Sequence, residues 1–507
     1  MSDSSSPTGL RALPPGWCWS TIGEVGRVQL GRQRSPKHHE GPDMRPYLRV
    51  ANVFEDRIDT SDVMQMNFTD AEFETYRLAV GDILLNEGQS PELLGRPAMY
   101  RDEVPGACFT NTLVRFRAGP CVSASYALAV FRYYMHSGRF RAIGTITTNI
   151  AHLGAGRLSE VEFPVPPPNE QARIVATLDE LFSKLDAATA ALVRVRANLK
   201  RYRASVLKAA AGGRLTEEWR AKHPGTEPAS VLLDRTLQER RRKWEEEQLA
   251  RFAEKGQKPP AGWQAKYKSP AAPDTSDLPE LPDGWAWASV EQFTTLVTKG
   301  TSPNWQGYEY TDDGVAFVRS QNVRWGSLDL SELAFLSPMF NETHRNSIIE
   351  AGDVLLNLVG ASVGRSAVAT DEIAGANLNQ AVAIIRLVSG GMLNRLLVAF
   401  ILSPLVQSHI TDTKADVARA NFNLDDIRPM PVPLPPLAEQ TEIVAEVERR
   451  LSMLDAMERQ VDAGLTRCTR LRQAVLKRAF EGNLVPQDPN DEPASVLLEM
   501  IREERRP

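Results

Sequence analysis

Apolar residues return at alternating steps of four and three residues along one stretch in the middle of the chain. The positions are Ile174, Leu178, Leu181, Leu185, Ala188, Leu192, Val195, Leu199, Tyr202 and Val206. This heptad spacing predicts a single amphipathic helix, about 40 residues and therefore about 60 Å long. A second stretch, 269 residues further on, keeps an apolar or small residue at eight of the ten positions. Arg450 and Gly464 interrupt it, and Leu451 and Leu465, each one position on, restore the stripe.

A single long helix cannot hide such a stripe from water. Two helices of matching pattern in one chain are therefore expected to pair with each other, and the long connection between them permits an antiparallel coiled coil. The alternative is that each helix packs separately on its own globular domain.

Outside the two helices the pattern changes to short apolar runs bounded by Gly, Pro, Asn and Asp. Examples are "GDILLN" at 81–86, "NTLVRFR" at 111–117 and "AVAIIRL" at 381–387. Such runs predict strands. One amphipathic helix is expected at 126–143 and another at 395–411, so the globular parts are assigned to the α+β class.

The chain is a tandem duplication, because several short motifs occur twice. The pairs are "LPPGW" at 13–17 with "LPDGW" at 281–285, "GDILLN" at 81–86 with "GDVLLN" at 352–357, "PPPNEQ" at 166–171 with "PPLAEQ" at 435–440, and "EPASVLL" at 227–233 with the same letters at 492–498. A repeat of this length indicates two domains of similar fold rather than a solenoid.

These boundaries divide the chain into seven expected parts. They are a flexible N-terminus at 1–12, a first globular domain at 13–165, a central long helix at 166–215, a charged and Pro-rich connector with one or two helices at 216–280, a second globular domain at 281–432, a C-terminal long helix at 433–485 and a tail at 486–507.

Composition narrows the class of protein. The hydrophobic share of 42% is ordinary, no run approaches the length that spans a bilayer, and the N-terminus does not resemble a signal peptide, so we expect a cytoplasmic protein. Four cysteines, Cys18, Cys108, Cys121 and Cys468, are too scattered for a metal site or a disulfide framework, and buried thiols are expected.

Charge alone does not identify a partner. The net charge is −5, from 59 Lys and Arg against 64 Asp and Glu. Locally, residues 194–208 carry six basic residues and no acidic one. This stretch is a candidate surface for phosphates, with a solvated helix face as the alternative. The segment "QERRRKWEEEQ" mixes both signs and is typical of an exposed, salt-bridged helix.

A search for catalytic motifs finds no phosphate-binding loop, zinc-protease motif, nucleophile elbow or Cys-x-x-Cys pair. The adjacent His38 and His39 lie in a predicted loop and are expected at the surface. The sequence therefore contains none of these catalytic motifs, and no metal site is expected.

Residue types that pair with base edges or phosphates recur in loops beside the predicted strands of both domains. For each of them, capping or turn formation is the alternative. The candidates are Arg32, Gln33, Arg34, Ser35, Lys37, Arg49, Asn52, Arg96, Thr110, Asn111, Thr112, Thr148 and Asn149 in the first domain, and Lys299, Thr301, Ser302, Asn304, Arg319, Gln321, Asn322, Arg365, Asn379, Gln380, Arg419 and Asn421 in the second.

The repeated motifs resemble those of the specificity subunit of type I restriction-modification systems. That family has two target-recognition domains, each beginning near an L-P-x-G-W segment, and two long helices introduced by a P-x-P-x-x-E-Q motif. The resemblance extends over nearly all of 13–500. The long charged connector at 216–280 departs from the family pattern, and the motifs do not reveal its role.

The resemblance implies a non-catalytic DNA-reading subunit of a phage-defence system. Each domain would read one half of a split target in double-stranded DNA, and the helix pair would set the gap. Partners would be two methyltransferase subunits, which bring S-adenosylmethionine, and motor-nuclease subunits, which bring ATP and magnesium. No cofactor is expected on this chain itself.

Two other classes of function remain open. One is a cryptic nuclease or methyltransferase. The other is a coiled-coil scaffold that spaces two protein-binding domains without touching DNA. Because the net charge is negative, we expect the chain alone to discriminate DNA sequences weakly and to discriminate sharply with a methyltransferase bound.

Overall fold

The computed structural model describes residues 12–147, 150–416 and 422–504. The chain divides into two compact units. Unit 1 comprises residues 1–193 and 461–507, and unit 2 comprises residues 194–460. No helix among the described residues has both the length and the apolar character that a membrane span requires.

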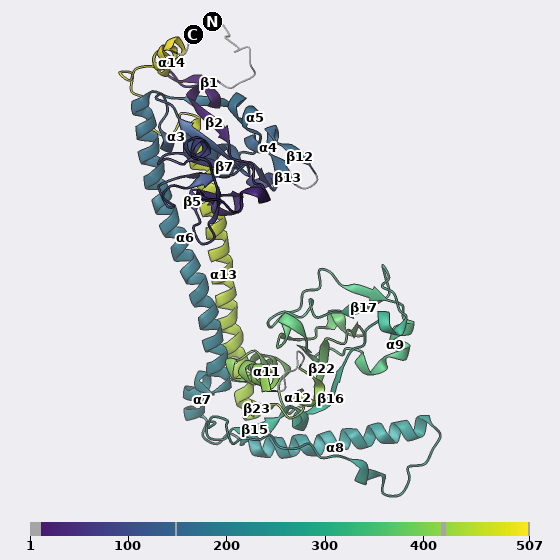
Figure 1. The fold of residues 1–507 in the computed structure, drawn as a ribbon. Helices are drawn as coiled ribbons and strands as arrows, with labels where there is room; N and C mark the ends of the chain where they lie inside the picture. The colour runs from purple at the N-terminus through teal and green to yellow at the C-terminus, as the bar shows by residue number, and fades with distance from the viewer. Residues whose placement is uncertain (1–11, 148–149, 417–421, 505–507) are drawn as a thin grey trace, which may run out of the picture. The chain divides into compact units, whose positions relative to one another are not determined.

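Two helices of 44 residues each, α6 (Pro168–Ala211) and α13 (Leu437–Phe480), contribute one end to each unit. In unit 1, Asp186 of α6 pairs with Arg472 of α13, and in unit 2, Arg203 of α6 pairs with Asp455 of α13. An early residue of one helix thus meets a late residue of the other, so the helices run antiparallel, as predicted (Figure 1). A shift of 269 residues converts one ion pair into the other, with the two helices exchanged.

The predicted seam of this pair is not closed along its whole length. Val195, Tyr202, Met457 and Leu471 are each more than 40% exposed. Two helices cover only part of a shared stripe, and the seam residues are fully buried where a globular domain also packs on them, as at Ile174 and Ile443 (0% exposed). Close contact is made at Gly464, where an added Cβ would lie 3.1 Å from the Leu192 side chain.

The globular domain of unit 1 is built around an antiparallel sheet of order β2-β11-β7-β9, with smaller sheets of order β10-β3-β6 and β12-β13-β8 beside it. The strands are β1 (Cys18–Thr21), β2 (Gly26–Leu30), β3 (Met44–Leu48), β4 (Val53–Phe54), β5 (Arg57–Ile58), β6 (Met64–Asn67), β7 (Ile83–Asn86), β8 (Gly88–Gln89), β9 (Pro97–Met99), β10 (Cys108–Phe109), β11 (Leu113–Ala118), β12 (Thr145–Thr147), β13 (Ile150–His152) and β14 (Glu162–Val165). The helices are α1 (Ile22–Val25), α2 (Asp70–Tyr76), α3 (Ala124–His136), α4 (Arg139–Ile143) and α5 (Ala155–Glu160).

Unit 2 repeats this plan with sheets of order β16-β22-β19-β20 and β18-β17-β21. Its strands are β15 (Ala286–Ser289), β16 (Thr294–Lys299), β17 (Val315–Val318), β18 (Ala334–Leu336), β19 (Val354–Asn357), β20 (Ser366–Val368), β21 (Asn377–Leu378), β22 (Val382–Leu387) and β23 (Pro431–Leu434). Its helices are α7 (Glu217–Lys222), α8 (Ala229–Glu254), α9 (Met339–Thr343), α10 (Asn394–Ile401), α11 (Pro404–Asp416) and α12 (Leu424–Ile427). The predicted pair of similar α+β domains with a coiled-coil pair is confirmed.

Each of the two helices predicted within the globular domains proves to be two. The segment 126–143 is split between α3 and α4 at Gly138, which adopts a left-handed backbone with φ of 79°. The segment 395–411 is split between α10 and α11 just before Pro404. Proline has no N–H to continue a helix and its ring disfavours helical geometry in the preceding turn, so both breaks have a local cause.

The repeated Glu-Gln pair fastens each long helix to its globular domain. Gln171 accepts a hydrogen bond from the backbone N–H of Ser123 at 3.0 Å and donates one to the carbonyl of Cys121 at 2.8 Å. Gln440 makes the same two bonds with the equivalent residues of unit 2, at 2.9 and 3.0 Å. Both side chains are almost completely buried, where an unpaired amide would cost about 1–3 kcal/mol. The motif therefore fixes how each domain sits on its helix.

The glutamate of the same motif has different surroundings in the two units. Glu439 is fully buried and accepts hydrogen bonds from Trp285 Nε1 at 2.8 Å, Thr216 at 2.6 Å and Arg220 at 2.5 Å. Glu170 is 1% exposed, and its Oε1 has no hydrogen-bond partner among the described residues. Burial raises the pKa of Glu170, although nearby Trp17 and Arg173 act in the opposite direction.

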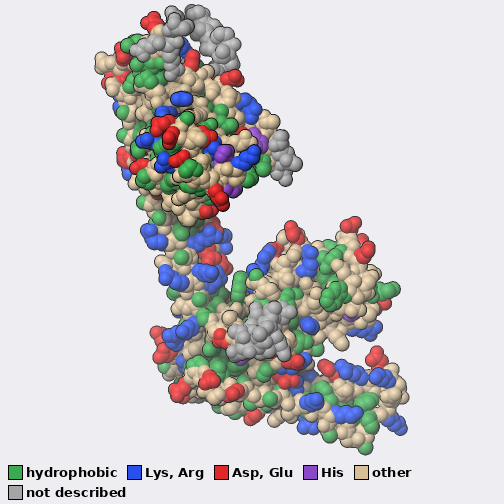
Figure 2. All heavy atoms as spheres, viewed as in Figure 1, with side chains coloured by type: hydrophobic (Ala, Val, Ile, Leu, Met, Phe, Trp, Pro, Cys, Tyr) green, Lys and Arg blue, Asp and Glu red, His purple; other side chains and the backbone are tan. Residues whose placement is uncertain are grey.

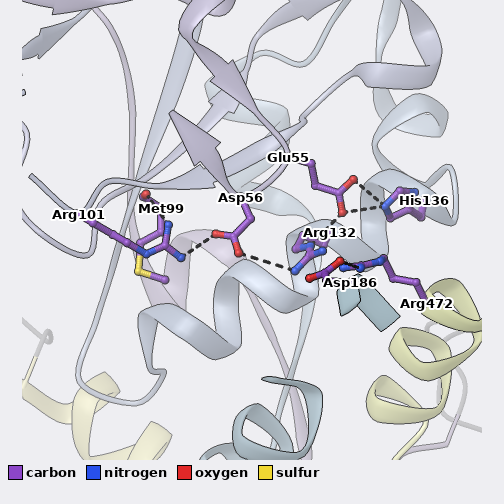
Figure 3. A network of polar contacts seen from close by, with 8 residues as sticks. All are labelled: Glu55, Asp56, Met99, Arg101, Arg132, His136, Asp186 and Arg472. Atoms are coloured by element: carbon purple, nitrogen blue, oxygen red, sulfur yellow. Dashed lines mark hydrogen bonds and ion pairs between the residues drawn. The ribbon is translucent and has the colours of Figure 1, made fainter. Parts of the chain in front are cut away.

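In unit 1 a charged network joins the globular domain to the long helices (Figure 3). Arg132 of α3 donates to Glu55 at 2.9 Å, and His136 Nε2 lies 3.0 Å from the same carboxylate oxygen. Arg132 also lies 3.9 Å from Asp56, which Arg101 holds from the other side at 2.8 Å. Burial alone would raise the pKa of Glu55, but the hydrogen bond from His136 and the charge of Arg132 outweigh it and lower this pKa to about 2.

Phe182 of α6 connects this network to the helix pair. The guanidinium of Arg132 lies 4.9 Å from the centre of the Phe182 ring, and that of Arg472 on α13 lies 4.8 Å from it. Arg472 is the partner of Asp186 on α6. Cation–π contacts of this kind contribute about 0.5–2 kcal/mol each, so one ring links three segments of unit 1.

The two "EPASVLL" segments both begin a helix that docks beside the start of a globular domain. The N–H of Ala229, at the start of α8, donates to the carbonyl of Gly284 at 2.8 Å, and the N–H of Ala494, at the start of α14 (Ala494–Glu504), donates to that of Gly16 at 2.9 Å. The first part of the connector is therefore packed structure.

Candidate nucleic-acid interface

In both units a polar loop leaves the main sheet at a glycine. Gly31 follows β2 and Gly300 follows β16. An added Cβ would lie 2.2 Å from the carbonyl oxygen of Thr110 at the first and 1.7 Å from that of Leu378 at the second. Such distances exclude any larger residue. The close crossing turns the loop across the second sheet and exposes several predicted contact residues: Gln33, Arg34, Lys37, Lys299 and Asn304.

Arg32 does not fit its predicted role as a DNA contact. It is 6% exposed, pairs with Glu72 at 2.8 Å and stacks over Phe68 at 4.8 Å. Burial would raise the pKa of Glu72, but hydrogen bonds from Thr69 and the charge of Arg32 lower it below its usual range. Arg32 therefore stabilises the base of the loop from inside the domain.

Asn52 and Asn322, two of the predicted DNA contacts at equivalent positions, also stabilise the fold. Asn52 Oδ1 accepts the N–H of Arg49 at 3.0 Å, and Asn322 Oδ1 accepts that of Arg319 at 2.9 Å. Each Nδ2 donates to backbone carbonyls across the following loop, and each residue is 2% exposed. Asn52 and Asn322 therefore close the turns that display the two arginines, and the prediction that they contact bases is corrected.

Thr110 is likewise inaccessible, at 0% exposure, with its hydroxyl 3.3 Å from the carbonyl of Leu48. Its neighbour Thr112 accepts the N–H of Val50 at 3.1 Å. These bonds tie the strand after Thr110 to the turn that carries Arg49. The structure thus brings together the segments that carry Arg32, Arg49 and Thr110.

A second arginine follows a glycine turn in each unit. Gly95 and Gly364 have φ of 71° and 84°, in the left-handed region that favours glycine. They precede Arg96 and Arg365, whose segments pair with the ends of β7 and β19 through backbone hydrogen bonds of 3.2 and 2.9 Å. A tight turn therefore displays each of these two arginines. Arg96 stacks over Phe54 at 4.7 Å.

The four arginines at these matched positions have similar surroundings. Each is only partly exposed, and the buried Nε of each has no hydrogen-bond partner among the residues that the structure describes; they are Arg49, Arg96, Arg319 and Arg365. Arg45 and Arg115 of unit 1 also have a buried Nε without a partner among the described residues. The four side chains recur at equivalent places in both units, which suits a surface that makes similar contacts twice. Guanidinium groups match phosphate and the O6/N7 edge of guanine.

The other predicted residues vary in accessibility. Gln321 and Gln380 are exposed, and the remainder of the described set is partly exposed: Ser35, Asn111, Thr112, Thr301, Ser302 and Asn379. Asn379 Oδ1 already accepts the N–H of Ala381 at 3.2 Å. The predictions at Thr148, Asn149, Arg419 and Asn421 lie outside the described residues.

One residue in the loop after β16 was missed by the sequence reasoning. Trp305 follows Asn304 and is 87% exposed, the largest exposed fraction among the large hydrophobic residues described. A short 3-10 turn at Asn304–Gln306 and Gly307, with φ of 80°, hold its backbone. A tryptophan within a polar loop was the available signal, because such a side chain is normally buried.

Across residues 12–147, 150–416 and 422–504, no three His, Cys, Asp or Glu side chains converge in a way that would hold a metal ion. Cys108 and Cys121 are buried as expected, whereas Cys18 and Cys468 are only partly buried. Burial raises the pKa of Cys108 to about 12, which suits a thiol that packs as a small apolar side chain.

Comparison with known proteins gives consistent matches. Residues 282–467 match the model of the type I restriction modification DNA specificity domain. The specificity subunit of the type I restriction enzyme EcoBI from Escherichia coli is 28% identical over 74% of this chain and 71% of its own length. That of EcoKI from Escherichia coli K12 is 23% identical over 97% of this chain and 96% of its own.

One solved structure, from work on complex assembly and conformational transition of the type I R-M system, superposes with a TM-score of 0.65 at 17% identity. The match covers 94% of this chain and 100% of that chain, and it supports the fold.

Proposed function

Since the fold, the repeated motifs and the sequence relatives all identify the specificity subunits of type I restriction-modification systems as the family of this chain, we propose that it reads a bipartite target in double-stranded DNA. Each globular domain reads one half. The observation that carries the proposal is the pair of matched arginines in each unit, Arg49 with Arg96 and Arg319 with Arg365, which buried asparagines and glycine turns hold at equivalent places.

The exposed loops supply the chemistry for two different half-sites. Arginine pairs with guanine, and asparagine or glutamine pairs with adenine, each good bidentate pair contributing about 1–3 kcal/mol of discrimination. The first loop presents Gln33, Arg34 and Lys37, whereas the second presents Lys299 and Asn304. The two domains have similar folds, but their loops expose different residues. The two halves of the target are therefore expected to differ in sequence.

Trp305 adds a contact of another kind to the second domain. An indole that is 87% exposed gains by burying 150–250 Å² of surface in a complex, as aromatic side chains typically do. In this proposal it stacks on a base or wedges into a base step at the second half-site. Trp305→Ala should therefore weaken recognition of the second half and leave the first half unchanged.

The helix pair sets the number of unread base pairs between the halves. A helix rises 1.5 Å per residue and a DNA strand rises 3.4 Å per base pair. Seven residues inserted after Val193 in α6, together with seven after Gln460 in α13, keep the heptad phase. They should lengthen the gap by about three base pairs.

Partner subunits supply catalysis. Methyltransferase subunits would bring S-adenosylmethionine, motor-nuclease subunits would bring ATP and magnesium, and this chain would bind none of these cofactors. A partner surface is supported by the half-exposed seam in unit 2, where a groove of about 580 Å³ is lined by Val195, Tyr202, Met453 and Met457. Methionine-rich apolar surfaces of this kind are typical of protein docking sites.

The proposal is tested by changing four arginines together: Arg34, Arg49, Arg319 and Arg365 to Ala. With its methyltransferase partner the variant should lose DNA binding. The charge-preserving Lys variants of the same four residues should keep salt-sensitive binding and lose sequence discrimination, because lysine cannot make the bidentate contact. DNA binding unaffected by the Ala variant would favour a scaffold that spaces two protein-binding domains.

A further inference from the structure

Helix α8 beyond Arg240 and the segment that returns along it, as far as Lys268, form an arm. Recognition of DNA bases does not explain this arm. The first turns of α8 are docked in unit 2, where Ala229 and Leu232 are fully buried. Arg240 anchors the next turns by donating to the carbonyl of Thr294 at 2.9 Å and lying 3.7 Å from Glu291. Beyond Arg240 the helix continues to Glu254 and runs away from the rest of unit 2 (Figure 1).

The segment that returns from the end of α8 is folded onto the helix. Trp263 is 9% exposed and stacks on Trp244, with ring centres 5.8 Å apart, and Phe252 lies 6.1 Å away. Tyr267 packs against Trp244 at 5.3 Å and accepts a hydrogen bond from Arg240 at 2.8 Å. The arm is therefore a small ordered body with its own aromatic core, in contrast to a flexible linker.

The tip of this arm, residues 251–268, is strongly basic. It contains one acidic residue, Glu254, and five exposed basic residues: Arg251, Lys255, Lys258, Lys266 and Lys268. The whole chain, by contrast, has a net charge of −5. No ion pair is found for the five cations within the described structure. Nearer the root, Arg241 and Arg242 are paired with glutamates of the same helix. Figure 2 shows Lys and Arg side chains along the arm.

The composition of the tip favours one class of partner. Lysine is depleted at protein–protein interfaces relative to the rest of the surface. Its compact, strongly hydrated charge binds phosphates without demanding a fixed geometry, and clustered lysines supply the salt-dependent, sequence-independent part of DNA binding. Four of the five cations are lysines, which suits a DNA backbone better than an acidic protein surface.

We propose that the α8 tip contacts DNA phosphates outside the bases that the recognition loops read. The inference rests on the proposed DNA-reading function and extends it, because it assigns a role to the connector and enlarges the footprint beyond the bipartite target. It predicts a contribution to affinity that depends on salt and on flanking DNA, and that is indifferent to sequence.

The test uses the full chain assembled with its methyltransferase partner and a 60-base-pair duplex carrying the target found by sequencing of methylated bases, with binding measured between 50 and 300 mM salt. Each phosphate contact contributes about 0.9 to the slope of log K against log salt. The variant with Arg251, Lys255, Lys258, Lys266 and Lys268 all changed to Gln should flatten this slope by about 2–4. A duplex trimmed to the target should bind wild type and variant alike.

The matched control changes the four lysines to Arg, which keeps the charge, and it should retain the wild-type slope. An unchanged slope in the Gln variant would overturn the inference. So would a Gln variant that binds DNA normally but fails to join its partner subunits, because the tip would then be a protein contact. A wild-type chain that binds no DNA under any condition would instead contradict the proposed function itself.

Discussion

The same structural position, where each globular domain meets its long helix, is fixed by a charged network in unit 1 and mainly by apolar side chains in unit 2, where one ion pair, Arg395 with Glu448, joins the domain to α13. In unit 1 a cavity of about 190 Å³ is lined by Asp56, Arg101, Arg132 and Phe182. In unit 2 the residues at the positions of Asp56, Arg132 and Phe182 are Gly326, Leu402 and Leu451, and the cavity there is about 560 Å³.

The two units share the same backbone fold, but different side chains hold the globular domain against its long helix in each unit. The glutamine contacts are the same in both units. They place each domain on its helix in the same way, whatever residues line the cavity. An ionic network fixes the domain of unit 1 with directional contacts that depend on pH and salt. Apolar packing in unit 2 is less directional and less sensitive to pH and salt.

The largest loss of stability is expected when Arg132 of unit 1 is replaced by leucine, the residue at the equivalent position of unit 2. Arg132→Leu removes the cation shared by Glu55 and Asp56, leaving partly buried carboxylates without it. Removing one partner of a buried ion pair costs about 3–5 kcal/mol, and partial exposure should reduce this to about 3 kcal/mol. Hydrogen exchange of unit 1 amides would report the loss.

The double variant with Glu55→Gln is the control for Arg132→Leu. It should recover part of the stability, because the neutral amide no longer needs a cation. Equal exchange in the wild type and in Arg132→Leu would show that the network does not stabilise unit 1.

Acid should destabilise unit 1 through the same network. The pKa of Glu55 is lowered to about 2 in the folded chain, below its value in the unfolded chain. Its contribution to stability is therefore complete above the unfolded pKa of about 4.3 and is lost as pH falls toward 2. After allowance for partial exposure the contribution is about 2 kcal/mol.

Unfolding followed between pH 6 and pH 2 should show this loss, and Glu55→Gln should flatten the acid limb for unit 1. An acid limb that Glu55→Gln leaves unchanged would assign the pH dependence to other carboxylates.

The reciprocal exchange in unit 2 should have a smaller effect. Leu402→Arg introduces a cation into a mainly apolar cavity where Trp325 occupies the position of Glu55 and Glu448 is already paired with Arg395. Because Leu402 is only partly buried, the long side chain can reach solvent, and we expect a loss of about 1 kcal/mol. Leu402→Met, of similar volume, is the control, measured by urea unfolding of unit 2. A stabilising Leu402→Arg would show that the cavity accepts charge.

The smallest effect is expected at Glu170. Its pKa is raised by burial, so the folded chain favours its protonated form, and its contribution to stability is lost as pH rises through the folded pKa. Glu170→Gln should therefore raise the stability of unit 1 at neutral pH by a few tenths of a kcal/mol. Glu439→Gln weakens the contact with Arg220 and should instead cost about 2 kcal/mol. Losses of equal size would mean that the two glutamates are held alike.

The sequence revealed the parts of the structure that are local or repeated. The long helices follow from heptad spacing, and the paired motifs locate the places where domain and helix join. The breaks at Gly138 and Pro404 had visible signals that the apolar pattern obscured. The chemistry of the two cavities was not predictable in this way, because Asp56, Arg132 and Phe182 come from separate elements that only tertiary packing brings together.

The candidate interface shows the same division. Arg96 and Arg365 were identified because their residue type suits phosphates and base edges and they lie in loops beside predicted strands. Asn52 and Asn322 were assigned to DNA since their residue type suits adenine, yet each completes a turn three residues after an arginine, which is the common local role of asparagine. Residue type alone does not distinguish a side chain that contacts a base from one that holds such a side chain in position.

The measurement that most directly tests the central claim is single-molecule sequencing of methylated bases in the source genome, with the gene intact, deleted, or altered by replacing residues 13–165 with another first domain. The account predicts that one split motif, two short specified halves around a fixed gap, disappears on deletion. Replacement of the domain should change one half and leave the other half and the gap intact. A replacement that altered both halves, or a deletion that changed no motif, would contradict the assignment of one half-site to each domain.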